Sequence, residues 1–254
     1  MIFFLPEGID WHEVYIPATK EFIAGRSPFN VFSYFNAPWV LIPFIPLVFL
    51  PEPISRAILA FAALVSYGYT ALRLGAKLPA IALILISPLV LHNLLTGNID
   101  WLVALGFVMQ PQFGLFFLAI KPQIGSAVAL FWLIETWRSK GIKEVVKVFA
   151  PVTIALIITF ILYGFWPRQF LEFGSFTANA SLWPLSIPVG LALIVASIRK
   201  RQMKFAMGAS PCLSPYLKFH SWSPALLALS TSLPELAAAV IGLWIVIGIR
   251  GFGY

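Results

Sequence analysis

The chain contains only two aspartates, Asp10 and Asp100, and both lie near other polar residues in strongly apolar surroundings. Asp10 and Glu13 are three residues apart, so on an α-helix their carboxylates would share a face, with Trp11 and Tyr15 alongside. Two carboxylates on one face can supply a general base or bind a cation. A solvated acidic helix at a membrane interface is the alternative interpretation of the same residues.

Asn98 and Asp100 interrupt an apolar stretch, LLTGNIDWLVALGFVMQP, that runs from Leu94 to Pro111. Asparagine and aspartate are favoured at helix N-caps, because a side-chain oxygen accepts a hydrogen bond from a backbone N–H of the first turn. One interpretation is therefore that either residue only starts the next helix. The other is that both face a polar site, since ionisable groups at membrane depth are costly and usually functional.

Lys121 is a further candidate, and it follows another apolar stretch, with Pro122 and Gln123 directly after it. A lysine in this position could extend its ammonium group to the membrane interface. It could instead bind a phosphate as a point charge. Gln123 is its nearest polar neighbour and is a candidate for the same site.

A late segment, SPYLKFHSWSP, carries Lys218 and His220 between Tyr216 and Trp222. These four residues could form an interfacial belt, or the two basic ones could help to hold an anionic headgroup. His92 lies within an apolar run, where we expect a hydrogen-bonded packing residue.

The composition predicts a membrane protein that crosses the bilayer several times. The 254 residues are 60% hydrophobic and 11% charged, with a mean hydropathy of +0.90, and globular proteins carry about twice that charged fraction. Apolar runs recur over most of the length, and a soluble protein has no core large enough to bury them. The net charge of +7 does not indicate a nucleic-acid partner, because the lysines and arginines cluster in short gaps between apolar runs. A single cysteine, Cys212, excludes an internal disulfide and a cysteine-based metal site.

We expect one all-α domain over residues 1–254, with an amphipathic, extracytoplasmic segment (1–34) and a helical membrane bundle (35–254). Residues 39–50 contain two prolines and are short for a span, so a re-entrant or tilted segment is expected there. Two pairs of shorter apolar runs predict re-entrant or broken helices, at 100–109 with 113–120 and at 203–213 with 222–232. The longer runs cover residues 54–73, 78–96, 123–137, 145–164, 184–198 and 235–250.

Basic residues predict the orientation, because short cytoplasmic loops of membrane proteins are rich in lysine and arginine. Counting crossings from cytoplasmic clusters puts the segment 1–34, TGNID, Lys121 and the late segment outside, provided that residues 39–50 do not cross. Three clusters hold ten of the seventeen basic residues: Arg73 and Lys77; Arg138, Lys140, Lys143 and Lys147; and Arg199, Lys200, Arg201 and Lys204.

The order of these motifs resembles a known family. No P-loop, dinucleotide fingerprint, HExxH, GxSxG or CxxC is present. Over residues 9–230 the chain resembles the integral-membrane glycosyltransferases of the GT-C fold, in their bacterial and archaeal, mannosyltransferase-like branch that uses polyprenyl-phosphate sugars. The motifs are Asp10-x4-Tyr15-x2-Ala18-x6-Gly25-x2-Pro28-Phe29, Tyr34-x3-Pro38, Leu50-Pro51, Gly97-Asn98, Lys121-Pro122, Ser214-Pro215-Tyr216 and His220.

The resemblance implies a multi-pass plasma-membrane enzyme that moves a hexose or pentose, such as mannose, from a polyprenyl-phosphate carrier to an acceptor outside the membrane. It implies that Asp10 is the catalytic base of an inverting displacement and that Lys121 meets the donor phosphate. The partners would be the lipid-linked donor and membrane lipids. No cofactor is certain, and a divalent cation is the one candidate. The implied substrate-binding residues are Glu13, Tyr15, Asn98, Asp100, Lys121, Gln123, Lys218 and His220.

Two departures from the family pattern keep other functions open. The family usually has a membrane helix before the catalytic loop and a longer chain, and here that helix is absent, so a partner protein could supply the anchor. A non-catalytic scaffold subunit of a larger complex is the main alternative. A transporter for a lipid-linked substrate is the third, although no repeated halves are visible.

Overall fold

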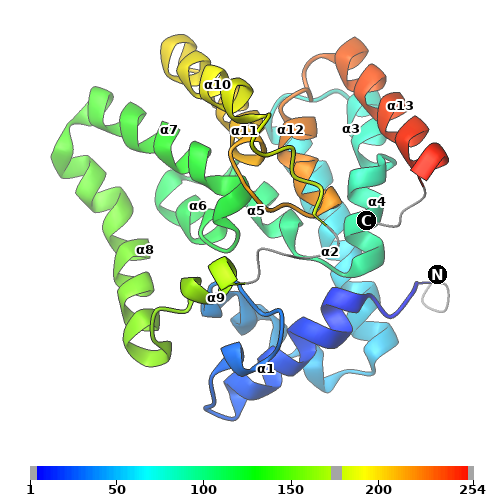
Figure 1. Cartoon of the computed structure of the whole chain (residues 1–254), viewed down its shortest axis with the longest axis vertical. Coiled ribbons are helices and arrows are strands. Elements are labelled where there is room, and N and C mark those ends of the chain that lie inside the picture. Colours follow the sequence, from blue (N-terminus) through cyan, green and yellow to red (C-terminus); the bar gives the residue numbers. More distant parts are fainter. Residues whose placement is uncertain (1–4, 173–178, 251–254) are drawn as a thin grey trace.

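The computed structural model describes residues 5–172 and 179–250, and within them every regular element is helical. The part of the predicted segment 1–34 that falls on residues 1–4 lies outside the described residues. From Trp11 the chain forms a π-helical turn (Trp11–Tyr15) that continues into α1 (Ile16–Ile23). A short 3₁₀ helix (Pro28–Asn30) follows. These helices form the lower layer in Figure 1.

Residues 39–50 do not form a spanning helix, as expected. They fold into two 3₁₀ helices, Pro38–Phe44 and Leu47–Phe49. Pro43 lies inside the first and Pro46 precedes the second, and a proline has no N–H for the helical ladder. The segment therefore stays beside α1 as part of the N-terminal layer.

Within the part of the chain that the structure describes, two helices are long and apolar enough to cross a membrane: α2 (Glu52–Arg73) and α8 (Ile142–Tyr163). A third candidate is the pair α3 (Leu78–Leu85) and α4 (Pro88–Thr96), which is bent by 48°. The break lies at Ser87, whose hydroxyl accepts a hydrogen bond from the Val90 N–H, with Pro88 at the first position of α4. The predicted run 78–96 is thus a broken helix.

The other predicted spans, 123–137, 184–198 and 235–250, form helices that are too short or too polar to count as crossings by length and composition. Helix α7 (Pro122–Lys140) carries Glu135, Arg138 and Lys140 in its last turns. Helix α10 (Ile187–Lys200) rises only about 21 Å, less than the ~30 Å of a hydrocarbon core. Length and composition therefore support two or three crossings. The last helix is α13 (Leu233–Arg250), and the short helices are α9 (Pro167–Glu172), α11 (Met203–Cys212) and α12 (Ser223–Leu227).

A tight helical hairpin connects the segment that contains Asn98 and Asp100 to Lys121. It consists of α5 (Asp100–Gly106) and α6 (Pro111–Leu118), which pack on each other and are followed by α7. A Cβ on Gly114 would lie 2.6 Å from the Gly106 carbonyl oxygen and equally close to Trp132 of α7. Glycine thus permits the close packing that brings the start of α5 and the start of α7 together.

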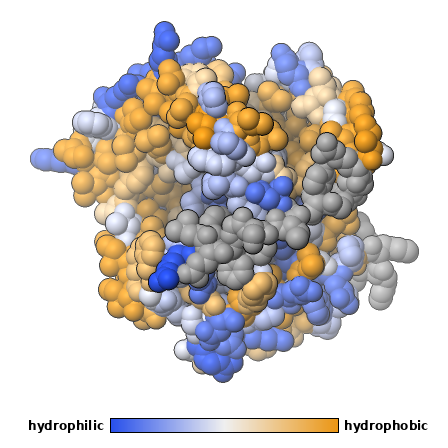
Figure 2. Space-filling view, in the orientation of Figure 1, coloured by the Kyte–Doolittle hydropathy of each residue, from blue (hydrophilic) through white to orange (hydrophobic). Residues whose placement is uncertain are grey.

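The N-terminal layer and the basic turns lie at opposite ends of the molecule. The turns after α2, α7 and α10 lie at the top of Figure 1, and α1 lies at the bottom. Trp11 fixes the layer to α2, because its indole N–H donates to Ser55 Oγ at 3.1 Å, and Phe29 contacts Tyr163 at the lower end of α8. Figure 2 shows hydrophilic residues at the upper and lower ends, hydrophobic residues along both sides between them, and a weakly hydrophilic patch at the centre. This distribution is compatible with a protein embedded in a bilayer.

Candidate functional site

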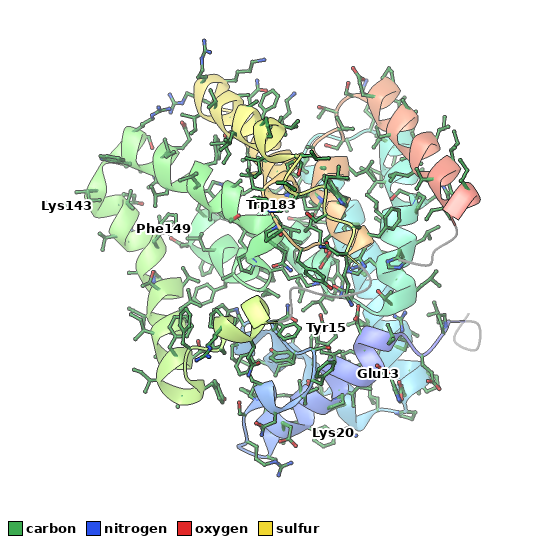
Figure 3. All side chains as sticks on the ribbon, in the orientation of Figure 1. Glu13, Tyr15, Lys20, Lys143, Phe149 and Trp183 are labelled. Atoms are coloured by element: carbon green, nitrogen blue, oxygen red, sulfur yellow. The ribbon has the colours of Figure 1, made fainter. Side chains whose placement is uncertain are left out.

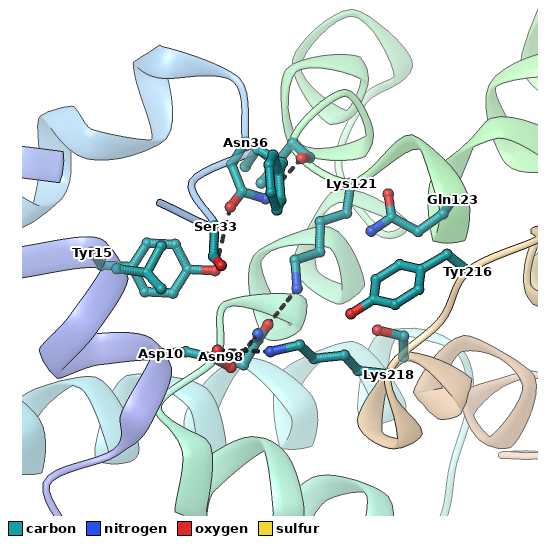
Figure 4. Close-up of a pocket in the computed structure, with 13 residues that line it drawn as sticks. Asp10, Tyr15, Ser33, Asn36, Asn98, Lys121, Gln123, Tyr216 and Lys218 are labelled. Atoms are coloured by element: carbon teal, nitrogen blue, oxygen red, sulfur yellow. Dashed lines mark hydrogen bonds and ion pairs between the residues drawn. The ribbon is translucent and has the colours of Figure 1, made fainter. Parts of the chain in front are cut away.

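A cavity of about 180 Å³ lies between the N-terminal layer and the helical bundle. Its walls come from the π-helical turn, the α4–α5 loop, the start of α7 and the loop that follows α11 (Figure 4). Six of the nine predicted site residues line it: Asp10, Tyr15, Asn98, Lys121, Gln123 and Lys218.

Asp10 is buried, and both of its carboxylate oxygens are occupied. Oδ1 accepts from Lys218 Nζ at 2.9 Å, and Oδ2 accepts from Asn98 Nδ2 at 2.6 Å. Burial alone would raise the pKa of this carboxyl, but the Lys218 charge and the two hydrogen bonds outweigh it and lower the pKa to about 2. Asp10 is therefore ionised at any physiological pH.

Asn98 joins the two halves of the site. Its Nδ2 donates to Asp10, while its Oδ1 accepts from Lys121 Nζ and from the Ile99 N–H. Gly97 makes this possible, since it ends α4 with a left-handed φ of +72° and a Cβ there would lie 2.8 Å from Trp11 Cβ. The Gly97-Asn98 pair thus lets the end of α4 contact the N-terminal layer.

Neither Asn98 nor Asp100 caps α5. The N-cap position is Ile99, and no side chain accepts a capping hydrogen bond there. Asn98 instead faces the cavity, whereas Asp100 is fully buried and does not line it. The capping interpretation is thus wrong for both residues, and of the two only Asn98 lines the cavity.

Asp100 holds Lys121 from behind. Its carboxylate forms an ion pair with Lys121 Nζ and accepts a hydrogen bond from Ser221 Oγ at 2.7 Å. Burial alone would raise the pKa of Asp100, but the Lys121 charge outweighs it and lowers the pKa. Lys121 therefore presents its ammonium to the cavity with an anionic partner on its other side.

His220 is also buried behind the cavity. Its Nε2 lies 3.6 Å from Asp100 Oδ2, and its Nδ1 lies 3.0 Å from Nδ1 of His92, whose ring stacks on it. Burial lowers the pKa of His220 to about 3, so the ring is neutral. The Asp100 carboxylate favours the tautomer with Nε2 protonated, in which Nδ1 accepts from His92. His92 is the hydrogen-bonded packing residue that the sequence predicted.

Glu13 lies outside the cavity, contrary to the expectation that it shares a face with Asp10. It is exposed, and Figure 3 shows it away from Tyr15 on the same turn. The cause is the π-helical turn, which bonds residue i to residue i+5 and so holds more residues per turn than an α-helix. Val14 and Tyr15, rather than Glu13, are buried on the side of Asp10.

Four polar residues that the sequence analysis did not propose as site residues complete the cavity wall: Ser33, Asn36, Tyr216 and Ser221. Asn36 donates to the Ile120 carbonyl at 3.1 Å and accepts from the Tyr15 hydroxyl at 3.4 Å, so it connects the N-terminal layer to the residue before Lys121. The Ser214-Pro215-Tyr216 motif pointed towards Tyr216. No sequence signal marked Ser33 or Asn36.

The described residues contain no group of three or more His, Cys, Asp or Glu side chains that could hold a metal ion. Both aspartates of the site have a lysine partner instead. No protein-family model matches this chain, and the searches of curated proteins and of solved structures found no match.

Proposed function

We propose that the protein is an inverting glycosyltransferase of GT-C type that takes a sugar from a polyprenyl-phosphate donor. One observation carries the proposal: Asn98 contacts both Asp10 and Lys121, and all three line one cavity. A carboxylate and an ammonium group thus lie one amide apart, which suits a base and a phosphate ligand at either end of a single sugar.

Each group has a role in a one-step displacement. The acceptor hydroxyl oxygen attacks the anomeric carbon, and Asp10 takes the hydroxyl proton. The bond from the anomeric carbon to the phosphate oxygen breaks, and its electron pair leaves with the polyprenyl phosphate. Lys121 stabilises the negative charge that develops there, and Asp100 keeps its ammonium in place.

The surroundings suit a lipid-linked donor at the outer surface. The cavity borders the N-terminal layer, at the end of the molecule opposite the basic turns, which the positive-inside rule assigns to the cytoplasm. Tyr15, Gln123 and Tyr216 line it beside the charged groups and offer hydroxyl and amide groups to a sugar ring. The prenyl chain would stay in the bilayer.

The test is transfer of radiolabelled mannose from polyprenyl-phosphate mannose in membranes that contain the protein, which supply the acceptor. Asp10→Asn keeps the shape of the side chain and removes the base, so we expect a loss of at least about 100-fold. Glu13→Gln is the matched control, because it removes a carboxylate from the same turn outside the cavity. Equal activity in wild type and Asp10→Asn would disprove the role of Asp10.

A further inference from the structure

We infer that Lys218 leaves Asp10 for the donor phosphate when the donor binds, so that Asp10 becomes an available base only in the occupied site. This inference rests on the proposed function. It adds a step that couples donor binding to the activation of Asp10.

The unoccupied site holds Asp10 in a poor state for catalysis. The carboxylate accepts hydrogen bonds from Lys218 and from Asn98 and still has lone pairs for an acceptor hydroxyl. The Lys218 ammonium, 2.9 Å from Oδ1, nevertheless stabilises the ionised form and so makes the carboxylate a weak base. The Asn98 bond comes from a buried side chain that also holds Lys121, so the Lys218 bond is the one that can open.

The two cavity lysines differ in their freedom to move. The Lys121 side chain is 7% exposed and contacts both Asp100 and Asn98. The Lys218 side chain is 36% exposed and lies in the loop between α11 and the 3₁₀ helix Phe219–Trp222. Figure 4 shows its chain extending along the cavity to reach Asp10. Rotation of this side chain can carry its ammonium to a ligand without moving a helix.

The charge balance gives the exchange a driving force. Lys121 pairs with Asp100 and Lys218 pairs with Asp10, so the two ion pairs carry no net charge. A phosphodiester brings one negative charge into this cavity, and a lysine that turns towards it gains a charge-assisted hydrogen bond. Asp10 then keeps the Asn98 bond and becomes a stronger base, because the nearest positive charge has moved away.

A double-mutant cycle tests the exchange through binding alone. The probe is farnesyl methyl phosphate, a phosphodiester whose charge is constant across the working pH range, titrated into protein in detergent micelles. In the Asp10→Asn background Lys218 has no ion pair to break, so Lys218→Met removes the whole contribution of Lys218 to probe binding. In wild type that contribution is smaller, because the ion pair between Lys218 and Asp10 must break before Lys218 can bind the probe. We expect Lys218→Met to weaken binding about tenfold more in the Asp10→Asn background.

Two outcomes separate this inference from the proposed function. If the probe binds wild type but the two substitutions act independently, Lys218 does not exchange partners and the inference fails, while the proposed function stands. If the probe does not bind wild type at all, the proposed function fails. The control cycle pairs Asp10→Asn with Gln123→Leu, which removes a neutral amide from the cavity wall at the start of α7, and we expect independent effects there.

Wild-type protein supplies a second measurement should Asp10→Asn not fold. Release of Lys218 lets the pKa of Asp10 return from about 2 towards its ordinary value of 3.8, so affinity for the probe should rise by up to tenfold per pH unit below pH 4 in a titration from pH 8 to pH 3. A flat profile would overturn the exchange. The other charged or titratable groups whose fields reach Asp10 or Lys218, and which the profile must take into account, are His220, Arg56, His92, Tyr15, Tyr216 and Asp100.

Discussion

Lys121 pairs with Asp100, a carboxylate that has no exposed surface and no place in the cavity wall. The two aspartates of the chain therefore have different positions: Asp10 faces the cavity and Asp100 supports the lysine that faces it. A substitution at Asp100 should therefore act on the stability of the protein, whereas a substitution at Asp10 should act on the reaction.

Asp100→Asn should strongly destabilise the protein, because it leaves the Lys121 charge buried without an anionic partner. Breaking such a pair costs about 3 to 5 kcal/mol. The thermal unfolding midpoint in detergent measures the effect. Adding Lys121→Met to Asp100→Asn removes the orphaned charge and should recover much of the stability. Failure of the second substitution to restore the midpoint would show that Asp100 stabilises the fold by other contacts.

Gly97→Ala should destabilise the protein by two mechanisms at once. An alanine must adopt a φ of +72°, and its Cβ would lie 2.8 Å from Trp11 Cβ. Gly25→Ala is the control, since Gly25 also ends a helix with a positive φ, +71°, and no neighbouring atom lies within 4 Å of the added carbon. Backbone strain alone costs about 1 to 3 kcal/mol, and we expect Gly97→Ala to cost more than Gly25→Ala. Equal unfolding midpoints for the two variants would mean that Trp11 moves away from the added methyl group without loss of stability.

Stability should fall as the pH drops below neutrality. Burial lowers the pKa of His220 from 6.5 to about 3, so between these values the unfolded chain binds a proton that the folded protein does not. This effect of His220 leaves the free energy of unfolding unchanged above pH 6.5. Between pH 6.5 and pH 3 it lowers the free energy of unfolding by at most about 1.4 kcal/mol per pH unit. Asp10, whose pKa falls from 3.8 to about 2, adds a loss only below pH 4. Unfolding midpoints from pH 7 to pH 4.5 should change less in His220→Gln, and an unchanged slope would contradict the assignment.

The predicted orientation can be tested with single cysteines. Cys212, the native cysteine, is buried, so background labelling should be low. Lys20 and Lys143 are both exposed, and Figure 3 shows Lys20 at the bottom of the molecule and Lys143 at its left edge, in the upper half. In intact bacterial cells, a membrane-impermeant maleimide should label Lys20→Cys, and Lys143→Cys should be labelled only after permeabilisation. Labelling of both variants in intact cells would rule out the predicted topology.

Local sequence patterns predicted much of the fold. The prolines of residues 39–50 excluded a spanning helix, and the apolar runs predicted the positions of α2 and α8. The number of crossings was overestimated, because a short apolar run such as 184–198 forms a helix, α10, that does not reach the length of a span. Sequence hydropathy reports the polarity of a segment but not where its helix begins, bends or ends.

The sequence by itself was enough to single out the two aspartates, Asn98 and the two lysines, because charged and amide groups are rare in so apolar a chain. Which of them face a ligand depended on the tertiary structure. The π-helical turn moved Glu13 away from Asp10, and the packing of the α5–α6 hairpin buried Asp100 behind Lys121. Both outcomes depend on the direction of a side chain relative to distant segments, and residue spacing on an assumed α-helix cannot supply that information.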